Sequence, residues 1–213
     1  MVFLQVFFII LAYIIGSIPF GFILGKLKGI DIRTQGSGNI GATNVGRLLG
    51  KKYAVLVYAL DLLKGACLVA LFRFKIIDPQ YMVLSPMLYG FLAALGHSYS
   101  CFMNFKGGKA VSTSCGMILG YSPITFVVII IAFLIIKKLT KLVSLGSLIS
   151  TFIAVLCIFI FAIIGKDPTL PKFYYTVDWE SFVVAFMTGS LIYIKHADNI
   201  KRLIKGEERI SNY

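Results

Sequence analysis

The segment between Arg33 and Gly50 holds the densest group of residues that could do chemistry. Five glycines alternate there with small polar side chains, and an arginine stands near each end. Glycines let backbone N–H groups turn toward an anion, and arginine offers a forked pair of donors to phosphate oxygens. A flexible Gly/Ser-rich linker is the alternative, but the arginines and the lack of repetition favour phosphate binding. The candidate ligands are Ser37, Gly38, Asn39, Gly41, Thr43, Asn44 and Arg47.

Two nucleotide-binding motifs fit this segment only in part. Residues 36–41 satisfy the G-x-G-x-x-G spacing, but an apolar helix rather than a strand is expected before them, so no βαβ unit supports the motif. Residues 41–48 have the spacing of a P-loop, but Arg47 replaces its lysine and Leu48 its Ser or Thr. The hydroxyl that would bind magnesium is therefore missing.

Two further basic segments could form anion sites. Lys106-Gly-Gly-Lys109 precedes an expected helix, whose first N–H groups attract anions, although an ordinary cytoplasmic turn would look the same. In the segment 195–206, His196 and Asn199 share one helical face, and a basic tail lying on the membrane surface is the alternative. His97 and His196 are the two histidines of the chain and the candidates for a general base.

Polar residues also fall inside apolar stretches. Asp61 and Lys64 lie three residues apart on one face of an expected helix, where a structural ion pair is the favoured interpretation. Ser144 and Ser147 lie at the start of another apolar stretch, where serines are commonly packing residues. Neither pair identifies a site by itself.

The elements that must position these residues are membrane helices. Hydrophobic residues make up 58% of the 213-residue chain and charged residues only 14%, whereas a soluble domain carries about 25% charged residues. We therefore expect one all-α, polytopic membrane domain over residues 1–213, with an outer surface that faces lipid. The net charge of +12 is scattered between apolar spans, which argues against nucleic acid as a partner.

The apolar stretches predict seven transmembrane helices. The first, Met1–Gly25, contains Gly21 and Gly25 in a G-x-x-x-G pair suited to close helix contact. The stretch Ala110–Ile136 is long for one span, and its Gly-Tyr-Ser-Pro sequence predicts a turn. We divide it into two short helices, over residues 107–120 and 122–138. The other spans are Tyr53–Phe72, Tyr81–Phe105, Leu142–Gly165 and Ser181–Ile194.

The positions of lysine and arginine predict the orientation of these spans. With seven spans and the N-terminus outside, most basic residues fall in cytoplasmic segments, whereas a six-span chain divides them evenly between the two sides. Only the seven-span arrangement obeys the positive-inside rule. The C-terminus and the three basic segments are then cytoplasmic.

Taken together, these motifs resemble one family, the bacterial membrane acyl-phosphate:glycerol-3-phosphate acyltransferases of the PlsY type. The matching stretches follow the family's order over nearly the whole chain, which is more specific than any single motif. They are Gly16-Ser-Ile-Pro19, Arg33 to Gly50, Asp61-x-x-Lys-Gly65, Gly96-His97, Phe105 to Lys109, Ser144-Leu-Gly146 and Lys195 to Leu203. Similar proteins have seven membrane helices and an active site on the cytoplasmic side.

The resemblance implies transfer of a fatty acyl group from acyl phosphate to the 1-hydroxyl of sn-glycerol 3-phosphate. The products are lysophosphatidic acid and phosphate, and the reaction is the first acylation of phospholipid biosynthesis. Acyl phosphate is a mixed anhydride with a good leaving group, so no covalent enzyme intermediate is needed. The resemblance also implies location in the bacterial cytoplasmic (inner) membrane and function as a monomer.

We assign roles to individual residues as hypotheses. The Gly-rich segment holds the acyl phosphate and stabilises the oxyanion, while Arg47, Lys106 and Lys109 hold glycerol 3-phosphate. The general base is left open between His97, His196 and a substrate phosphate. The catalytic set is Ser37, His97, Ser144, His196 and Asn199, and the substrate-binding set is Gly38, Asn39, Gly41, Thr43, Asn44, Arg47, Lys106, Gly107, Gly108, Lys109 and Ser147.

We expect neither a cofactor nor a metal. The four cysteines are widely spaced, with no Cys-x-x-Cys pair, and cytoplasmic lysines and arginines can neutralise two phosphates directly. A small transporter or anion channel is the rival class, and it would carry polar residues through the membrane centre. Only Asp61 and Lys64 are charged there, and the unusual residues collect on one side, which favours an enzyme.

Overall fold

In a computed structural model the chain forms a helical bundle, and the structure describes residues 1–165 and 177–210. Every regular element in these ranges is helical, as expected, with short 3₁₀ turns at Pro79–Tyr81 and Cys101–Met103. The α-helices are α1 (Val2–Ser17), α2 (Phe20–Leu27), α3 (Ala42–Leu49), α4 (Lys51–Arg73), α5 (Met87–Ser98), α6 (Val111–Tyr121), α7 (Pro123–Thr140), α8 (Val143–Ile164), α9 (Trp179–Lys195) and α10 (Ala197–Ile204).

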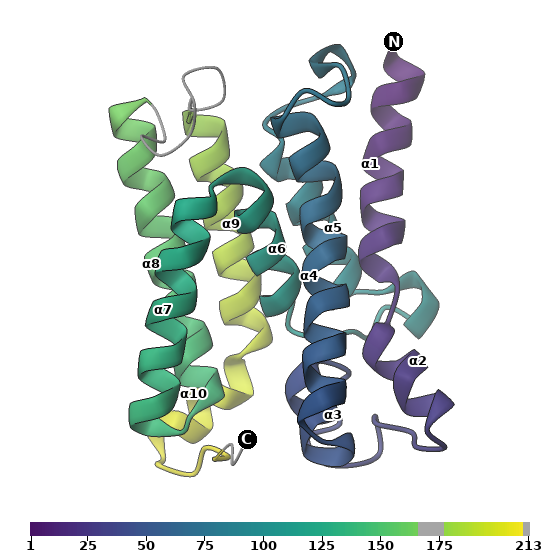
Figure 1. Cartoon of the computed structure of the whole chain (residues 1–213), viewed down its shortest axis with the longest axis vertical. Helices are drawn as coiled ribbons and strands as arrows, with labels where there is room; N and C mark the ends of the chain where they lie inside the picture. The colour runs from purple at the N-terminus through teal and green to yellow at the C-terminus, as the bar shows by residue number, and fades with distance from the viewer. Residues whose placement is uncertain (166–176, 211–213) are drawn as a thin grey trace.

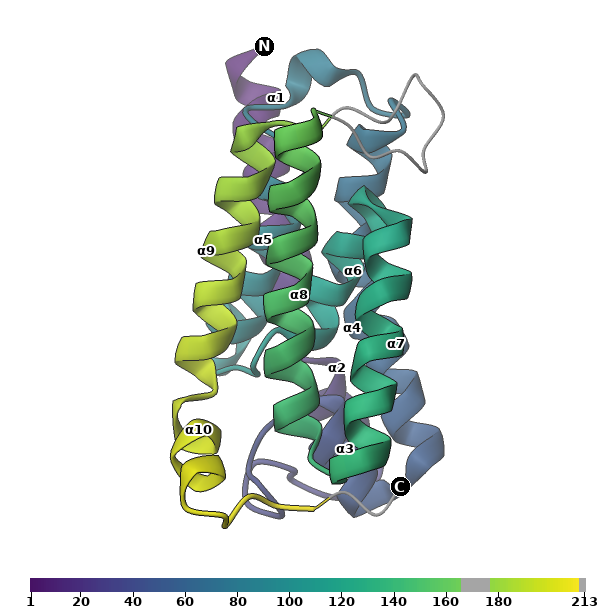
Figure 2. The same ribbon diagram turned by 90° about the vertical axis from the view of Figure 1, so that its left-hand side faces the viewer.

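The long helices run side by side, and the polar segments gather at one end of the bundle (Figure 1). α1, α4 and α5 pack together, α7 to α9 form a second group, and α6 joins the two groups through α4, α5 and α7. Figures 1 and 2 place α2, α3 and α10 at the end opposite the N-terminus. The Gly-rich loop before α3 and the C-terminal segment therefore meet there, although they are far apart in sequence.

Apolar side chains cover the outside of the bundle. Many Leu, Ile, Val and Phe side chains of α1, α7, α8 and α9 are exposed, which is the arrangement of a protein whose surface faces lipid rather than water. Among the described residues, four stretches are long and apolar enough to cross a membrane. They are Val2–Leu27, Lys51–Arg73, Pro123–Thr140 and Val143–Ile164.

The expected spans and the helices found differ at two places. In the stretch Tyr81–Phe105 the only α-helix is α5, of 12 residues, followed by the 3₁₀ turn Cys101–Met103. α6 has 11 residues, or about 17 Å at 1.5 Å per residue, and is short as expected. α7 lies close to the expected residues 122–138, but the expectation that it is too short to span a membrane is wrong, because its 18 residues are long and apolar enough to cross one. It starts at Pro123, which suits the first helical position, and continues to Thr140, where Lys141 turns left-handed.

The first and last apolar stretches each break into two helices. α1 ends at Ser17 and α2 begins at Phe20, because Pro19 between them has no N–H to donate. α9 ends at Lys195 and α10 begins two residues later. His196 therefore lies at a bend rather than inside a continuous helix, and α10 lies across the polar end of the bundle (Figure 2).

The glycine pair of α2 packs mainly against the loop that precedes α3. A Cβ on Gly21 would lie 2.0 Å from the carbonyl oxygen of Ile40, and a Cβ on Gly25 would lie 2.7 Å from the side chain of Ile32. Of the expected helix–helix contact at this G-x-x-x-G pair, the structure shows only the approach of Gly21 to Val45 of α3, at 3.3 Å from a Cβ on Gly21. The pair chiefly lets the Gly-rich loop approach the backbone of α2.

Candidate active site

A cavity of about 750 Å³ lies at the polar end of the bundle and extends inward between α6, α7, α8 and α9. All the expected catalytic residues line it, namely Ser37, His97, Ser144, His196 and Asn199. It is also lined by most of the expected substrate-binding residues, namely Gly38, Asn39, Gly41, Thr43, Asn44, Arg47, Gly107, Lys109 and Ser147. Segments that are separate in the sequence thus meet at one place.

Asn44 holds the Gly-rich loop in shape. Its Oδ1 accepts a hydrogen bond from the Ser37 N–H at 2.8 Å, and its Nδ2 donates to the carbonyls of Ile32 and Gln35 at 3.0 and 3.1 Å. Asn44 is only 1% exposed, and hydrogen bonds in such a low-dielectric interior rigidify the structure. Because its amide is already engaged, Asn44 shapes the loop rather than holding a ligand.

Three helix N-termini meet at the cavity. α3 begins after Gly41, α6 after Ala110 and α10 after His196, and none of these three N-cap residues makes a side-chain capping bond. Residues from the first turn of each helix line the cavity. N-termini attract anions, because their N–H groups and the helix dipole both point toward the ligand. The site thus offers several positions for negatively charged oxygen atoms.

The C-terminal segment folds back over the site and joins its polar side chains. Lys109 Nζ donates to Oδ1 of Asn199, whose Nδ2 donates to one carboxylate oxygen of Glu208 at 2.7 Å. Arg202 Nε donates to the other oxygen of Glu208 at 2.9 Å. Arg209 donates to a carbonyl of the Gly-rich loop at 3.0 Å. The loop, α10 and the lysine segment are therefore linked.

Burial changes the ionisation of two cavity side chains. Desolvation lowers the pKa of Lys109 to about 8, and the nearby Glu208 carboxylate opposes this shift. Desolvation also lowers the pKa of His196 to about 4, with a further contribution from the charge of Lys109. His196 Nδ1 lies 2.8 Å from the Ile192 carbonyl. This contact places the proton of the neutral ring on Nδ1 and leaves Nε2 as an acceptor.

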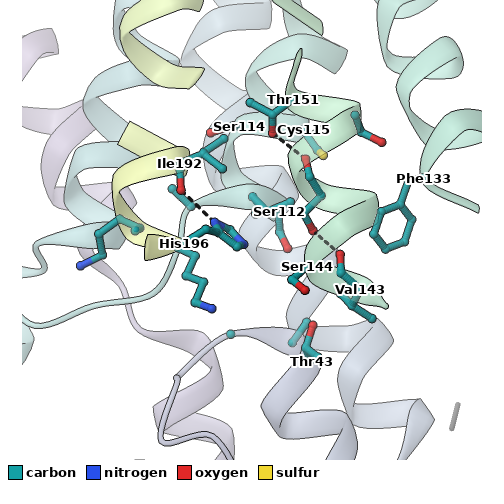
Figure 3. Close-up of a pocket in the computed structure, with 18 of the residues that line it drawn as sticks. Thr43, Ser112, Ser114, Cys115, Phe133, Val143, Ser144, Thr151, Ile192 and His196 are labelled. Atoms are coloured by element: carbon teal, nitrogen blue, oxygen red, sulfur yellow. Dashed lines mark hydrogen bonds between the residues drawn. The ribbon is translucent and has the colours of Figure 1, made fainter. Parts of the chain in front are cut away.

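Ser144 and Ser147 line the cavity from the first two turns of α8, and Figure 3 shows Ser144 there. Ser147 Oγ donates to the Val143 carbonyl at 2.9 Å. Ser144 Oγ is buried and has no hydrogen-bond partner within the part of the chain that the structure describes. An unsatisfied buried hydroxyl costs about 1–3 kcal/mol. Ser144 is therefore well placed to bond a ligand.

The cavity becomes apolar beyond these polar groups. Its inner walls carry aliphatic and aromatic side chains of α6 to α9, namely Met117, Ile118, Ile129, Ile130, Phe133, Leu134, Ala154, Val155, Ala185 and Ile192. An anion-binding end that continues into an apolar slot suits an amphiphile with a charged head and a hydrocarbon tail.

Lys106 and Gly108 do not line the cavity, in contrast to the other residues expected to bind substrate. Lys106 is exposed. Gly108 is buried, and a Cβ there would lie 2.1 Å from Nε2 of His97. The structure thus brings only the second lysine of this segment, Lys109, to the site.

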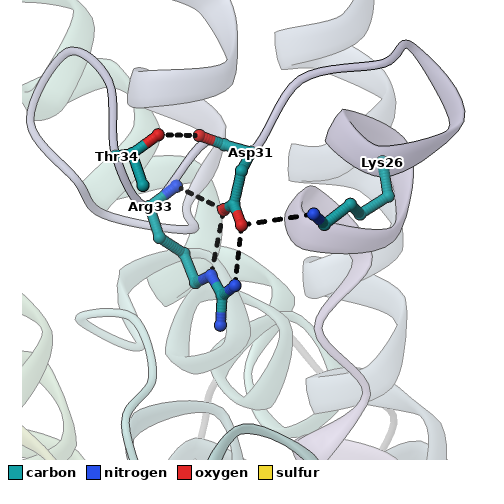
Figure 4. Close-up of polar contacts among 4 residues, drawn as sticks. All are labelled: Lys26, Asp31, Arg33 and Thr34. Atoms are coloured by element: carbon teal, nitrogen blue, oxygen red, sulfur yellow. Dashed lines mark hydrogen bonds and ion pairs between the residues drawn. The ribbon is translucent and has the colours of Figure 1, made fainter.

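Arg33 does not line the cavity either, although it flanks the Gly-rich loop. Its Nε and a terminal nitrogen donate to the two carboxylate oxygens of Asp31 at 2.9 and 2.7 Å (Figure 4). Lys26 contacts the same carboxylate at 3.3 Å. The hydrogen bonds from Arg33 hold the pKa of Asp31 far below its usual range, and Asp31 raises the pKa of Arg33. Arg47 is left to face the cavity from this segment.

Sequence reasoning missed Glu208 and Arg209, which both line the cavity. They follow α10 in a stretch without helical periodicity, so no spacing rule points to them. The pattern of charge could have pointed to them, because Glu207 and Glu208 are adjacent acidic residues in a mostly basic C-terminal tail. Ser114 was missed as well, and its buried hydroxyl lines the cavity without a partner among the described residues.

This arrangement can bring two phosphorylated molecules together at the mouth of an apolar slot. Basic side chains outnumber acidic ones in the lining, and two of the acids are already paired, Asp61 with Lys64 and Glu208 with Arg202. The described residues contain no group of three His, Cys, Asp or Glu side chains that could hold a metal. Lysine and arginine can hold both phosphates, so that a hydroxyl of one molecule can approach a carbonyl of the other.

Known proteins match this chain over almost its full length. The family model described as glycerol-3-phosphate acyltransferase matches residues 6–206. The chain is 44% identical over 205 residues to the glycerol-3-phosphate acyltransferase of Bacillus velezensis, with 94% of each chain covered. It is 43% identical over 201 residues to the enzyme of Bacillus subtilis, again with 94% of each chain covered.

Solved structures agree with these matches. The crystal structure of PlsY, an integral membrane glycerol 3-phosphate acyltransferase, in its glycerol 3-phosphate form has a TM-score of 0.84 and 37% identity, covering 98% of this chain and 96% of that one. The structure of the lysophosphatidic acid form has a TM-score of 0.82 and 37% identity, and the match covers 97% of this chain and 94% of that one. The helical fold, the apolar spans and the sequence matches lead to one assignment. The chain belongs to the glycerol-3-phosphate acyltransferase family and is an integral membrane enzyme.

Proposed function

We propose that the donor of this acyltransferase is acyl phosphate and that the acyl group goes to the 1-hydroxyl of sn-glycerol 3-phosphate. Lysophosphatidic acid and phosphate are then the products, and the step is the first acylation of phospholipid biosynthesis. The observation that carries the proposal is the cavity, in which basic side chains and three helix N-termini adjoin an apolar slot. Solved relatives described in glycerol 3-phosphate and lysophosphatidic acid forms support the acceptor and the product.

The Gly-rich loop and α3 hold the acyl phosphate in this proposal. Amides around Gly38 and Gly41, with the side chains of Ser37, Asn39 and Thr43, bind its phosphate and stabilise the oxyanion that forms at the carbonyl. Two cations from different segments of the chain, Arg47 and Lys109, hold the phosphate of glycerol 3-phosphate. The unpartnered hydroxyl of Ser144 completes the polar end. Asn199 accepts a hydrogen bond from Lys109 and orients its ammonium toward the substrate, and the acyl chain occupies the apolar slot.

The reaction needs one proton transfer. The hydroxyl oxygen attacks the carbonyl carbon, the bond from that carbon to the phosphate oxygen breaks, and the hydroxyl proton leaves. A pKa of about 4 makes His196 a weak base at neutral pH, whereas a phosphate monoester has a second pKa of about 6. We therefore assign the proton to a substrate phosphate. His196 accepts a hydrogen bond at Nε2 and orients the attacking hydroxyl.

A donor assay tests this proposal directly. Purified protein in detergent is supplied with glycerol 3-phosphate and either acyl phosphate or acyl-coenzyme A, and lysophosphatidic acid and phosphate are both measured. We expect one phosphate released per lysophosphatidic acid formed from acyl phosphate. Product from the thioester with none from acyl phosphate would show that the donor is wrongly assigned.

The kcat/KM for glycerol 3-phosphate should fall as the pH rises above about 8. The pKa of Lys109 is lowered to about 8 by burial, so this side chain loses its charge above that pH in the free enzyme. Bound phosphate favours the charged form, and the corresponding fall in kcat should occur at higher pH. Initial rates between roughly pH 6 and pH 10 give the pH profiles of kcat/KM and of kcat and so check both predicted falls. A kcat/KM that stays constant across this range would contradict the role of Lys109.

Catalysis should continue in excess EDTA. Magnesium prefers carboxylates together with substrate phosphates, and the excess of basic side chains in this cavity repels cations. The measurement uses freshly desalted enzyme, with and without added magnesium. A loss of activity that magnesium restores would show that a metal holds the phosphates, and Asp198, which lines the cavity, would be the first ligand to test.

We propose seven membrane-spanning segments, formed by α1 with α2, α4, α5, α6, α7, α8 and α9, in the bacterial inner membrane. The N-terminus is outside, and the cavity and the C-terminus face the cytoplasm. Because one chain lines the whole cavity, we expect the monomer to be active. Single cysteines placed at residues 26–52, 106–109 and 137–141 in a cysteine-free chain should react only from the cytoplasmic side. A label that reaches residues 137–141 only from outside would refute this topology.

A further inference from the structure

A buried charged cluster lies behind the loop that carries Lys109. Lys64 Nζ is 2.8 Å from Oδ1 of Asp61, and Nδ1 of His97 is 3.6 Å from the same oxygen. The three side chains are at most 5% exposed. Removing an ion pair from water costs free energy that the mutual attraction only partly offsets, so a buried pair is weak evidence of stabilisation. The cluster therefore calls for another explanation.

His97 forms the surface on which the loop rests. The Gly108 N–H donates to the His97 carbonyl at 2.9 Å. A Cβ on Gly108 would lie 2.1 Å from Nε2 of the His97 ring, and a Cβ on Gly107 would lie 2.0 Å from the His97 carbonyl oxygen. The glycine pair thus packs directly on the ring and backbone of His97. A rotation of the imidazole would displace the pair and with it Lys109, the next residue.

The loop also adopts a conformation that its surroundings must enforce. Asn104, Phe105 and Ala110 have left-handed φ angles of 50°, 57° and 60°, which non-glycine residues seldom adopt unless the structure around them requires it. On its far side the cluster is anchored, because Lys64 also donates to the Ile18 carbonyl at 2.8 Å, at the break between α1 and α2. The cluster thus connects three helices to the loop.

We propose that Asp61 and His97 are positioning residues that set where the Lys109 ammonium meets the substrate phosphate. The Asp61 carboxylate lies 3.6 Å from Nδ1, beyond hydrogen-bond distance, and orients the ring through its charge. The ring supports the glycine pair, and Lys64 neutralises Asp61. This assignment takes His97 out of the set of candidate general bases. It rests on the proposed role of Lys109 in holding glycerol 3-phosphate.

The test compares Asp61→Asn, Lys64→Met and the double variant in the full chain in detergent. Each single variant leaves one charge unpaired and should lower the midpoint of thermal unfolding. The charge-balanced double variant should recover most of that loss in the midpoint. If the role of the ion pair were purely structural, the double variant would regain full activity together with its thermal midpoint. We expect instead that the KM for glycerol 3-phosphate stays about tenfold or more above wild type while kcat changes little, because a binding group displaced by about 1 Å can cost up to 10²-fold.

Arg73→Met is the matched control. Arg73 is another buried cation of α4, three turns beyond Asp61 and 8% exposed, and its loss should lower the unfolding midpoint without raising KM. A double variant with both a restored midpoint and a wild-type KM overturns the proposal.

Gly108→Ala provides a second route if the double variant does not fold. Its Cβ should push the loop away from His97 and raise KM, and this effect should shrink in a His97→Ala background. An unchanged KM in Gly108→Ala overturns the proposal. Binding of glycerol 3-phosphate alone, measured by calorimetry, repeats the comparison without the donor. A wrong donor assignment is therefore seen separately, as a wild-type enzyme that binds glycerol 3-phosphate but does not turn over acyl phosphate.

Discussion

Lys109→Met should lower kcat/KM for glycerol 3-phosphate by about 10²-fold. Lys109 lies at the polar end of the cavity, where it donates to Asn199. A hydrogen bond to a charged group contributes about 1.5–3 kcal/mol, and the upper value corresponds to about 10²-fold in rate. Methionine keeps the apolar stem but not the ammonium, so the loss reports charge and not volume. Steady-state rates at varied glycerol 3-phosphate check the prediction, and most of the change should appear in KM.

Lys106→Met is the control for this experiment. Both lysines flank the same glycine pair, but Lys106 is exposed and does not line the cavity. Its replacement should leave kcat/KM within about twofold, as expected for the loss of an exposed surface charge. A large loss in Lys106→Met with little effect in Lys109→Met would reverse the two assignments.

The two lysines show where sequence reasoning reaches its limit. Residue type and spacing correctly locate the basic glycine loop before a helix, because that pattern is local in the chain. Which lysine faces inward depends on the left-handed residues Asn104, Phe105 and Ala110. Asn tolerates that conformation, but the side chains of Phe105 and Ala110 do not favour it, and packing on His97 enforces it. No propensity rule could have separated Lys106 from Lys109.

The other site segments repeat this pattern. The Gly-rich loop and the His196–Asn199 segment are found from their residue types, and α3 and α10 begin beside them. That these helix starts share one cavity depends on the packing of α4 on α6 and of α8 on α9, which involves residues far apart in sequence. Asn44 illustrates the consequence. Its type predicts a ligand, but its three loop hydrogen bonds give it a structural role.

Glu208 could not be found from the sequence, since its role depends wholly on tertiary contacts. It bridges Asn199 and Arg202 at 2.7 and 2.9 Å, and neither partner is related to it by helical spacing. The helix boundaries were more accessible to sequence reasoning, because Pro123 begins α7 where the turn was expected. The end of α7 at Thr140, before the left-handed Lys141, also lies within two residues of the expected 138. Only the expectation that this helix is too short to cross a membrane failed.

Arg47→Ala should cost about 1.5–3 kcal/mol of binding or transition-state stabilisation, or roughly 10- to 10²-fold in kcat/KM. Arg47 lies on α3 and lines the cavity. Two carboxylates of the cavity pair with other cations, Asp61 with Lys64 and Glu208 with Arg202. Arg47 forms no ion pair within the described residues, so its guanidinium is available for a substrate phosphate. Arg47→Lys should recover only part of the loss, because lysine keeps the charge but not the forked geometry.

Arg33→Ala is the matched control for Arg47, since both arginines flank the same glycines. Arg33 is exposed and binds Asp31 outside the cavity, so its loss should change kcat/KM by no more than about twofold, as for other exposed ion pairs. Kinetics at varied glycerol 3-phosphate and at varied acyl phosphate show which substrate each arginine serves. Arg47→Ala with activity within twofold of wild type would remove Arg47 from the site. Equal losses in both variants would mean that the arginines serve the shape of the loop and that the phosphate is held by the helix N-termini and Lys109.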